Sequence, residues 1–346
     1  MTTLSAIDIR SKLSDITKAL KKKIAENKRC YFANMRNNLK GGTKVLWRYI
    51  KSLNKTTVGV PPLVSNGQTI VDDSAKANAL NDYFQTIFHD RTFTPLSTYI
   101  PAIQTPMPAV CITKEGIVRL LHSLDSRKSH GPDGISSALL KECCDCISDY
   151  LLVLFRRSLE LGSLPREWKF AYIVPIFKSG DKTLVGNYRP ISLLPVCLKL
   201  MVHIIYTSIM KHLSQNNFFS MAQHGFRLGF SCTTQLIEFY HDVASSFDKG
   251  VQVDCVFLDF KKAFDTMPHS LLLHKLSALQ LHSQIYHWLE DYLTFRTQAV
   301  VRNGSESRTV AVTSGVPQGS VSLVAQGSNV LKHPTIRRIQ RGHVTP

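Results

Sequence analysis

The sequence predicts a mixed α+β fold across most of its 346 residues. Apolar residues at helical spacing recur along the chain, and they are interrupted by short apolar runs at residues 172–177 and 251–259. A third strand pattern, at residues 298–312, turns at Asn303-Gly304 as a β-hairpin does. Since these strands do not alternate regularly with helices, the pattern disfavours a doubly wound parallel sheet.

The composition excludes several protein classes. With 44% hydrophobic and 19% charged residues, the chain is neither fibrous nor disordered. No run of 18 apolar residues occurs, so no membrane span is predicted. The stretch from Met1 to Arg10 carries Asp8 and no apolar core of a signal peptide, so we expect an intracellular protein of the nucleus or cytoplasm, not a secreted one.

The first 60 residues form a predicted basic helical arm. They hold 14 Lys and Arg against three acids, a net charge of +11 out of +17 for the chain. Such a segment would bind the phosphates of a nucleic acid without sequence preference. Leu13, Ile16, Leu20 and Ile24 share one helical face, so a solvated amphipathic helix is the plainer alternative, and a membrane surface or calmodulin is a further one.

Residues 61–110 are predicted to be a linker with one helix. Pro61-Pro62 and Asn66-Gly67 indicate turns, and Asp72 to Ser74 offer a helix N-cap ahead of apolar residues at positions 80–88. Prolines at positions 95, 101, 106 and 108 then exclude a regular helix.

From residue 111 the pattern is mainly helical. Further helices are expected from Thr113, up to Gly162, and over residues 196–213, 236–247, 271–281 and 285–292. The eight cysteines are scattered except for those at positions 143, 144 and 146; since Cys143-x-x-Cys146 lacks a second pair at zinc-finger spacing, we interpret the thiols as ordinary unpaired cysteines.

Two segments carry candidate chemistry. Asp259 ends the apolar run 251–259, in which Val251, Val253, Cys255 and Phe257 lie at alternate positions. At the end of a strand its carboxylate can hold a divalent cation in a cleft, or it can merely cap the next helix. Some fifty residues later, the loop 314–320 carries glycines that allow a close backbone approach to a ligand, and Gln318 offers both a donor and an acceptor.

The ordered motifs of residues 110–320 resemble the reverse transcriptase of LINE-type retrotransposons, which lack long terminal repeats. The motifs are Gly131-Pro132-Asp133-Gly134-Ile135, residues 164–169 (LPREWK), residues 188–194 (YRPISLL), residues 223–227 (QHGFR), residues 257–265 (FLDFKKAFD) and residues 315–319 (GVPQG). The resemblance implies the fingers and an incomplete palm of a right-hand polymerase over residues 111–320. It also implies an RNA template, a DNA primer and deoxynucleotides as partners.

The resemblance also implies roles for single residues. Asp259 matches the first carboxylate that binds Mg²⁺ and is catalytic, and Phe260 would lend its backbone carbonyl to the same ion. Asp265 is interpreted as a structural acid. The residues matching nucleotide contacts are Lys178 and Arg189 on the triphosphate, Phe264 under the sugar and Gln318 beside the base. Arg227 matches a residue that contacts the template or the triphosphate. The plain alternatives are that Phe264 is an ordinary core residue and that Arg227 is an ordinary surface residue.

The chain departs from the family after residue 320. No Asp or Glu follows Glu306, so the paired aspartates that complete the family's metal site are missing, and residues 321–346 are an unrelated basic tail. We therefore interpret the chain as a truncated polymerase, inactive as written, with uncovered apolar surface in the palm. The alternative function is a non-catalytic nucleic-acid-binding remnant that uses its basic arm and fingers.

Overall fold

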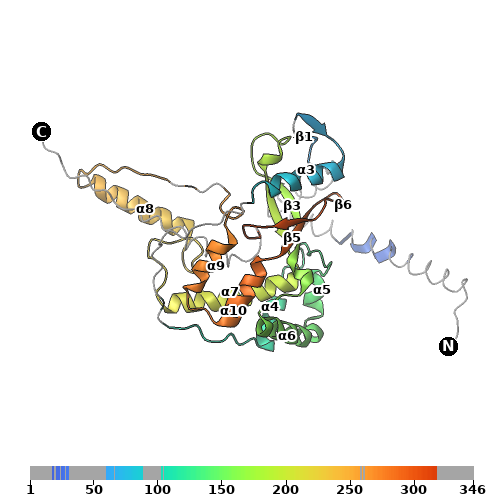
Figure 1. Ribbon diagram of the computed structural model, residues 1–346, viewed down its shortest axis with the longest axis horizontal. Coiled ribbons are helices and arrows are strands. Elements are labelled where there is room, and N and C mark those ends of the chain that lie inside the picture. The colour runs from blue at the N-terminus through green and yellow to red at the C-terminus, as the bar shows by residue number, and fades with distance from the viewer. Residues whose placement is uncertain are drawn as a thin grey trace, which may run out of the picture. The chain divides into compact units, whose positions relative to one another are not determined.

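The structure is a computed structural model that describes residues 18, 21–23, 25–27, 29–30, 60–65, 67–88, 103, 105–257, 259 and 262–317 (Figure 1). The chain divides into two compact units, Met1–Gly59 and Val60–Pro346. In the first unit the described residues, which include Lys21, Lys22 and Lys23, are helical and exposed. The apolar stripe of the expected arm and the tail 321–346 lie outside the described residues.

The second unit begins with a small hairpin and a helix. Strand β1 (Leu63–Ser65) pairs antiparallel with β2 (Gln68–Ile70), two strands that the sequence reading missed. Helix α3 (Asp73–Gln85) follows, and the Asp72 carboxylate accepts a hydrogen bond of 2.8 Å from the Ala75 N–H. The predicted N-cap and helix are thus confirmed.

The next segment is a layer of helices. It contains α4 (Lys114–His122), α5 (Ser137–Glu142), α6 (Cys144–Leu161) and the short 3₁₀ helix η2 (Arg166–Lys169). Thr113 caps α4 through a 3.2 Å bond from Gly116, and α6 ends at Gly162, whose φ is +60°. Side chains from α4 and α6 pack into the larger hydrophobic core.

Helix α7 (Val196–Gln215) passes through this larger core. By length and composition, among the described residues it alone could cross a membrane, but 56% of its apolar window is buried inside the protein. Leu198, Met201 and Ile205 are fully buried there. Its apolar character is therefore accounted for by core packing, and it is weak evidence for a membrane span.

A five-stranded sheet forms beside the helices. Its members are β3 (Phe170–Phe177), β4 (Tyr188–Leu193), β5 (Arg296–Arg302), β6 (Ser305–Glu306) and β7 (Val310–Val312), with 3₁₀ helix η3 (Val185–Asn187) leading into β4. The strand order is β4-β3-β5-β6, and β7 also pairs with β5. The β3–β5 pair is parallel and the others are antiparallel. The α+β class and the hairpin at Asn303-Gly304 are confirmed, whereas β4 was missed.

The helix α3 covers one face of this sheet. Leu80 and Phe84 pack with Ile173 of β3 and Val300 of β5 in a second, smaller core. Asn81 reaches across and donates a 2.8 Å hydrogen bond to the carbonyl of Arg308. Residues 73–85 are therefore packed against the strands and are part of the same folded body as the sheet, although the sequence placed them in a linker.

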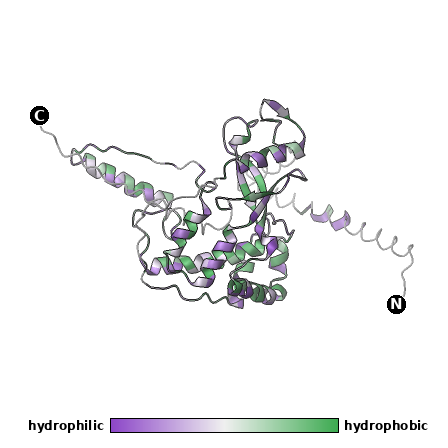
Figure 2. Cartoon of the chain, viewed as in Figure 1, coloured by the Kyte–Doolittle hydropathy of each residue, from purple (hydrophilic) through white to green (hydrophobic). Residues whose placement is uncertain are grey.

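The remaining helices are α8 (Cys232–Phe247), α9 (His269–Ser277) and α10 (Ser283–Leu293), all three predicted. Helix α8 carries many apolar residues, coloured green in Figure 2, and several of their side chains are exposed. Leu236 is 65% exposed and Tyr240 75% exposed. Among its described residues only Ser246 is buried.

The predicted strand at residues 251–259 is wrong. The described residues of this segment have no regular secondary structure, and Val256 and Phe257 are about four-fifths exposed, at 79% and 81%. Its alternation of apolar residues is real, but a strand needs a hydrogen-bonded neighbour. Among the described residues no strand pairs with it, so the propensity alone does not form one.

Candidate nucleotide-binding site

The two segments with candidate chemistry lie against each other. Residues 264–269 and 314–316 are joined by an isolated β-bridge between Pro268 and Ser314. Gly315 N–H donates to the Met267 carbonyl and Val316 N–H to the Phe264 carbonyl, both at 2.8 Å. The sequence could not show this contact, because about fifty residues separate the two segments.

Gly315 makes this close approach possible. Its φ is +78°, and a Cβ built on it would lie 2.5 Å from the Phe264 carbonyl oxygen and 2.7 Å from the Asp265 Cα. Both neighbours are backbone atoms that cannot turn aside. The sequence predicted that glycine here admits a ligand, whereas the structure shows that it admits another part of the same chain.

Two side chains add to this junction. The Ser314 hydroxyl donates to the Asp265 carbonyl, and His269 Nε2 lies 2.8 Å from the Gly315 carbonyl, close enough to donate to it. Burial lowers the pKa of His269; its bond to Gly315 raises the pKa, and the nearby positive charge of Arg296 lowers it. The sequence reading named neither Ser314 nor His269 as a site residue, and their only signal was proximity to the two motifs.

Asp259 is exposed and follows the segment that lacks a strand partner. In the described part of the chain, no three His, Cys, Asp or Glu side chains come together in a way that could hold a metal ion. A pair of divalent ions needs several carboxylate oxygens between them. The residues present therefore do not fit a two-metal centre. The carbonyl of Phe260, the other expected ligand, lies outside the described residues.

The expected triphosphate cations lie on the β3–β4 hairpin. Arg189 is exposed on β4, where its Cα pairs with that of Ile176 on β3. Lys178 is exposed directly after β3, and its N–H donates a 2.8 Å bond to the Asn187 carbonyl. Both charges are thus solvent-accessible on one rigid hairpin, which suits contacts with phosphate.

Arg227 is held by its surroundings. Its guanidinium donates 2.7 Å and 3.3 Å bonds to the carbonyls of Ser220 and Gln223, and it stacks on Phe230 with 4.1 Å to the ring centroid. His224 of the same loop is buried and contacts Thr234 and Glu238 of α8. The structure therefore shows a half-buried arginine that orders its own loop.

Phe264 is half-buried, and Gln318 lies outside the described residues. The structure thus brings the Phe264 segment to the glycine loop. It places Arg227 in a separate loop that precedes α8. The roles expected for these side chains at the sugar and base of a nucleotide remain predictions.

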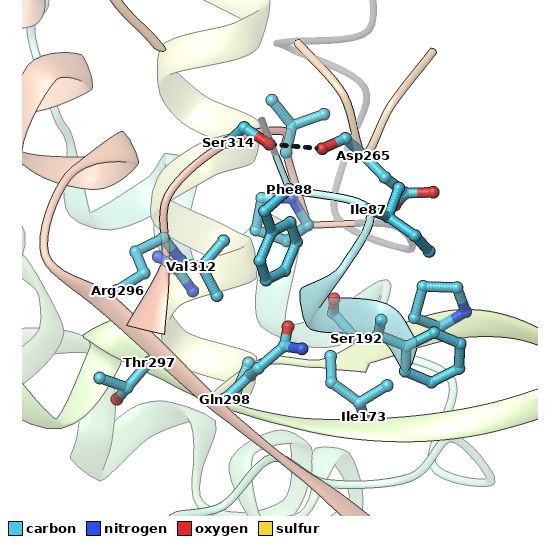
Figure 3. Close-up of a pocket in the computed structure, with 15 residues that line it drawn as sticks. Ile87, Phe88, Ile173, Ser192, Asp265, Arg296, Thr297, Gln298, Val312 and Ser314 are labelled. Atoms are coloured by element: carbon cyan, nitrogen blue, oxygen red, sulfur yellow. Dashed lines mark hydrogen bonds between the residues drawn. The ribbon is translucent and has the colours of Figure 1, made fainter. Parts of the chain in front are cut away.

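A cavity lies behind the junction, between the end of α3, the sheet and the glycine loop (Figure 3). The space in it that is open to the centre of a water molecule is about 30 Å³, enough for ordered water but not for a whole nucleotide. Asp265 and Ser314 lie at its upper edge in Figure 3, with Gln298 and Ser192 below them.

Arg296 lines this cavity and is only 3% exposed. One of its nitrogens, Nη1, donates a 3.2 Å bond to the Tyr292 carbonyl, and the guanidinium lies 5.0 Å from the Tyr292 ring centroid. Within the described part of the protein, Nη2 has no hydrogen-bond partner. Burial lowers the pKa of Arg296. The site therefore contains a buried cation whose hydrogen bonding is incomplete.

Comparison with known proteins gives the family of this region. The model of the family "Reverse transcriptase (RNA-dependent DNA polymerase)" matches residues 176–325. Residues 176–325 form a reverse transcriptase domain. The matched residues include Lys178, strand β4, Asp259 and the glycine loop, so the sequence-based resemblance is confirmed.

The relatives of this reverse transcriptase are proteins of mobile elements. The chain is 30% identical over 285 residues to the probable RNA-directed DNA polymerase from transposon BS of Drosophila melanogaster, which covers 80% of this chain and 31% of that protein. It is 28% identical over 321 residues to the RNA-directed DNA polymerase from mobile element jockey of Drosophila funebris, covering 89% and 35%. The chain therefore spans about a third of the length of these relatives.

A third relative comes from another element. The putative 115 kDa protein in type-1 retrotransposable element R1DM of Drosophila melanogaster is 31% identical over 262 residues, covering 74% of this chain and 24% of that protein. Two of these relatives are thus named RNA-directed DNA polymerases of mobile elements and the third a protein of a retrotransposable element, which agrees with the resemblance that the motifs carry. The family uses divalent metal ions in general.

Proposed function

We propose that a polypeptide of these 346 residues binds nucleic acid as the fingers and part of the palm of a retrotransposon reverse transcriptase, without catalysing nucleotidyl transfer by itself. The observation that carries the proposal is that, among the residues the structure describes, no group of His, Cys, Asp or Glu side chains forms around Asp259 to hold a metal ion, although Asp259 lies within the family match of residues 176–325. The sequence contains no Asp or Glu after Glu306 that could complete the site.

Binding is supported by the distribution of charge. Lys178 and Arg189 are exposed on the β3–β4 hairpin, and residues 1–60 add a net charge of +11. Positive groups of this kind release counterions from phosphates, which makes affinity strongly dependent on salt. RNA template and DNA primer are the partners we expect, with the arm contributing contacts that do not depend on sequence.

The absence of catalysis follows from the donor set. One carboxylate can supply oxygen ligands to one Mg²⁺ ion, but it cannot hold two ions that contact both the attacking and the leaving oxygen. RNA-directed DNA synthesis by the same polypeptide is the competing function, favoured by the family match over residues 176–325. It would require carboxylates from outside the family pattern.

Primer extension distinguishes these two functions. The purified polypeptide, an RNA template, a DNA primer, Mg²⁺ and deoxynucleotides are incubated beside the Asp259→Asn variant, which keeps the side-chain shape. We expect no extension from either protein, with RNA bound equally by both. Extension by the wild type that disappears in Asp259→Asn would refute the non-catalytic proposal.

Salt dependence tests the binding surface. Affinity for single-stranded RNA is measured between low and moderate salt for the wild type, for Lys178→Gln/Arg189→Gln, and for Arg157→Gln on α6 as a control. Each lost phosphate contact should reduce the slope of log K against log salt by about 0.7. The slope of log K against log salt should therefore fall by about 1.4 in the double variant and stay unchanged in the control. Equal slopes for all three proteins would remove the hairpin from the binding surface.

A further inference from the structure

Tyr83 of α3 contacts two segments of the reverse transcriptase domain at once. Its hydroxyl accepts a 2.7 Å hydrogen bond from Lys262 Nζ, and the same ammonium group lies 4.5 Å from the centroid of the Tyr83 ring. Tyr83 also lies against the turn that leads into β4, because a Cβ added to Gly186 would be 3.1 Å from the Tyr83 hydroxyl. These contacts connect α3 to sequences 103 and 179 residues further along the chain.

Lys262 shows a backbone conformation that requires outside support. Its φ is +53°, in the left-handed region that a residue with a Cβ adopts at a cost. Its carbonyl accepts bonds from the N–H groups of Asp265 and Thr266 at 2.9 Å and 3.1 Å, which closes a tight turn. This turn starts three residues after Asp259 and leads directly into the junction with the glycine loop.

The second segment is the turn before Arg189. Gly186 belongs to η3, and the next residue, Asn187, accepts the backbone hydrogen bond of Lys178. Tyr83 therefore lies between the η3 turn, which connects the two strands of the cation-bearing hairpin, and the turn that follows Asp259. A displacement of this ring would change the separation between the two halves of the site.

We propose that Tyr83 is a positioning residue: through its bond to Lys262 and its contact with the η3 turn, it fixes the turn from Lys262 to Asp265 relative to the Lys178 and Arg189 hairpin. The inference rests on the proposed function, in which that hairpin binds phosphate groups, and adds that those of a deoxynucleoside triphosphate are among them, as the resemblance implies. It adds that α3, outside the family match of residues 176–325, belongs to the nucleotide site.

Hydrogen–deuterium exchange in the free protein tests the contact itself. Tyr83→Phe keeps the ring and removes the hydroxyl, and Tyr150→Phe on the exposed face of α6 is the matched control. We expect Tyr83→Phe to speed the exchange of the Asp265 and Thr266 amides about fivefold, while α10 amides and the control stay unchanged. Unchanged turn amides, or faster exchange throughout α10, would overturn the proposal.

Lys262→Gly separates positioning from stability. Glycine relieves the positive φ, so the melting temperature should stay the same or rise, yet the turn loses its link to Tyr83. The double variant Tyr83→Phe/Lys262→Gly should exchange at Asp265 and Thr266 like either single variant, since both remove one contact. Additive effects on those amides would show that the two residues act separately and would refute the link.

Binding of a fluorescent deoxynucleoside triphosphate completes the test. We expect Tyr83→Phe and Lys262→Gly to weaken it about fivefold without lowering the melting temperature, whereas a merely structural role would lower both together. Equal affinity of wild type and variants would overturn the positioning role. A wild type that binds no triphosphate, with RNA binding intact, would instead refute the assignment of Lys178 and Arg189 to a triphosphate, and the positioning role with it.

Discussion

The junction at Gly315 allows a direct test of how the two site segments are held together. Replacing Gly315 by Ala places a methyl group 2.5 Å from the Phe264 carbonyl oxygen and 2.6 Å from that of Asp265. Because the obstacles are backbone atoms, the two segments must separate. Gly304→Ala is the matched control: its φ is +83°, close to the +78° of Gly315, but no atom lies within 4 Å of the added Cβ.

The expected magnitudes follow from these contacts. Placing alanine at a positive φ costs about 1 kcal/mol, and Gly304→Ala should show that cost alone. Gly315→Ala also disturbs the bonds from Gly315 N–H to Met267 and from Val316 N–H to Phe264, together with those of Ser314 and His269. If half of these four bonds are lost at about 1 kcal/mol each, the total reaches about 3 kcal/mol.

Urea unfolding followed by circular dichroism measures both variants. A loss of about 3 kcal/mol is a large part of the 5–15 kcal/mol that stabilises an ordinary domain, so Gly315→Ala should unfold at clearly lower urea. Hydrogen exchange should rise at Val316 in Gly315→Ala only. A difference of less than about 1 kcal/mol between the two variants would show that the close approach at Gly315 is not a stabilising contact.

Three further predictions concern His269, Arg296 and α8. Because burial lowers the pKa of His269, the imidazole binds a proton more readily in the unfolded state than in the folded state. The contribution of this residue to stability is therefore complete above pH about 6.5 and is lost as the pH falls below that value. In urea titrations at several pH values, His269→Gln should lose less stability at acidic pH than the wild type does. Arg296→Met should leave the free energy of unfolding within about 1 kcal/mol of the wild-type value or raise it, because an apolar side chain replaces a buried cation with an unpartnered nitrogen. A loss of about 3 kcal/mol or more would show that the guanidinium is fully paired. Leu236→Ser/Tyr240→Ser on α8 should reduce self-association in light scattering, while Val153→Ser, 69% exposed on α6, should not; equal scattering would exclude α8 as the cause.

The sequence predicted the helices well because their information is local. Asp72 and Thr113 cap their helices through bonds to residues three positions away, and such signals are visible in a short window. Strand β4 was missed because Pro190 and the polar residues around it hide an edge strand; Pro190 pairs with Pro175 of β3, and neither has an N–H to donate. Pro190 is tolerated because β4 is an edge strand, and Pro175 because it lies beyond the residues of β3, 170–173, that pair with β5.

Residues 251–257 illustrate the opposite case. Their alternation of Val251, Val253, Cys255 and Phe257 satisfies every local rule for a strand, yet a strand depends on a partner that may come from anywhere in the chain. The family motif marked Asp259 as a metal ligand, which stays a prediction, and no periodicity could indicate whether its strand would pair. The same limit hid Tyr83, which carries no motif and meets Lys262 only through the fold.

The unpaired segment and the exposed helix have one physical cause. Phe257 lies 5.9 Å from Phe239 of α8, ring centroid to centroid, so the segment and the helix share an apolar surface. A paired strand at 251–257 would give that surface a sheet to pack on and would fix Asp259 at its end. In the described part of the chain this pairing does not occur: α8 keeps Leu236, Ile237 and Tyr240 exposed, and Asp259 follows a segment that no described strand pairs with. Without sheet pairing at residues 251–257, the Asp259 carboxylate is positioned less precisely and less of the apolar surface is covered. The hairpin that carries Lys178 and Arg189 is unaffected, because it pairs through β3 with β5.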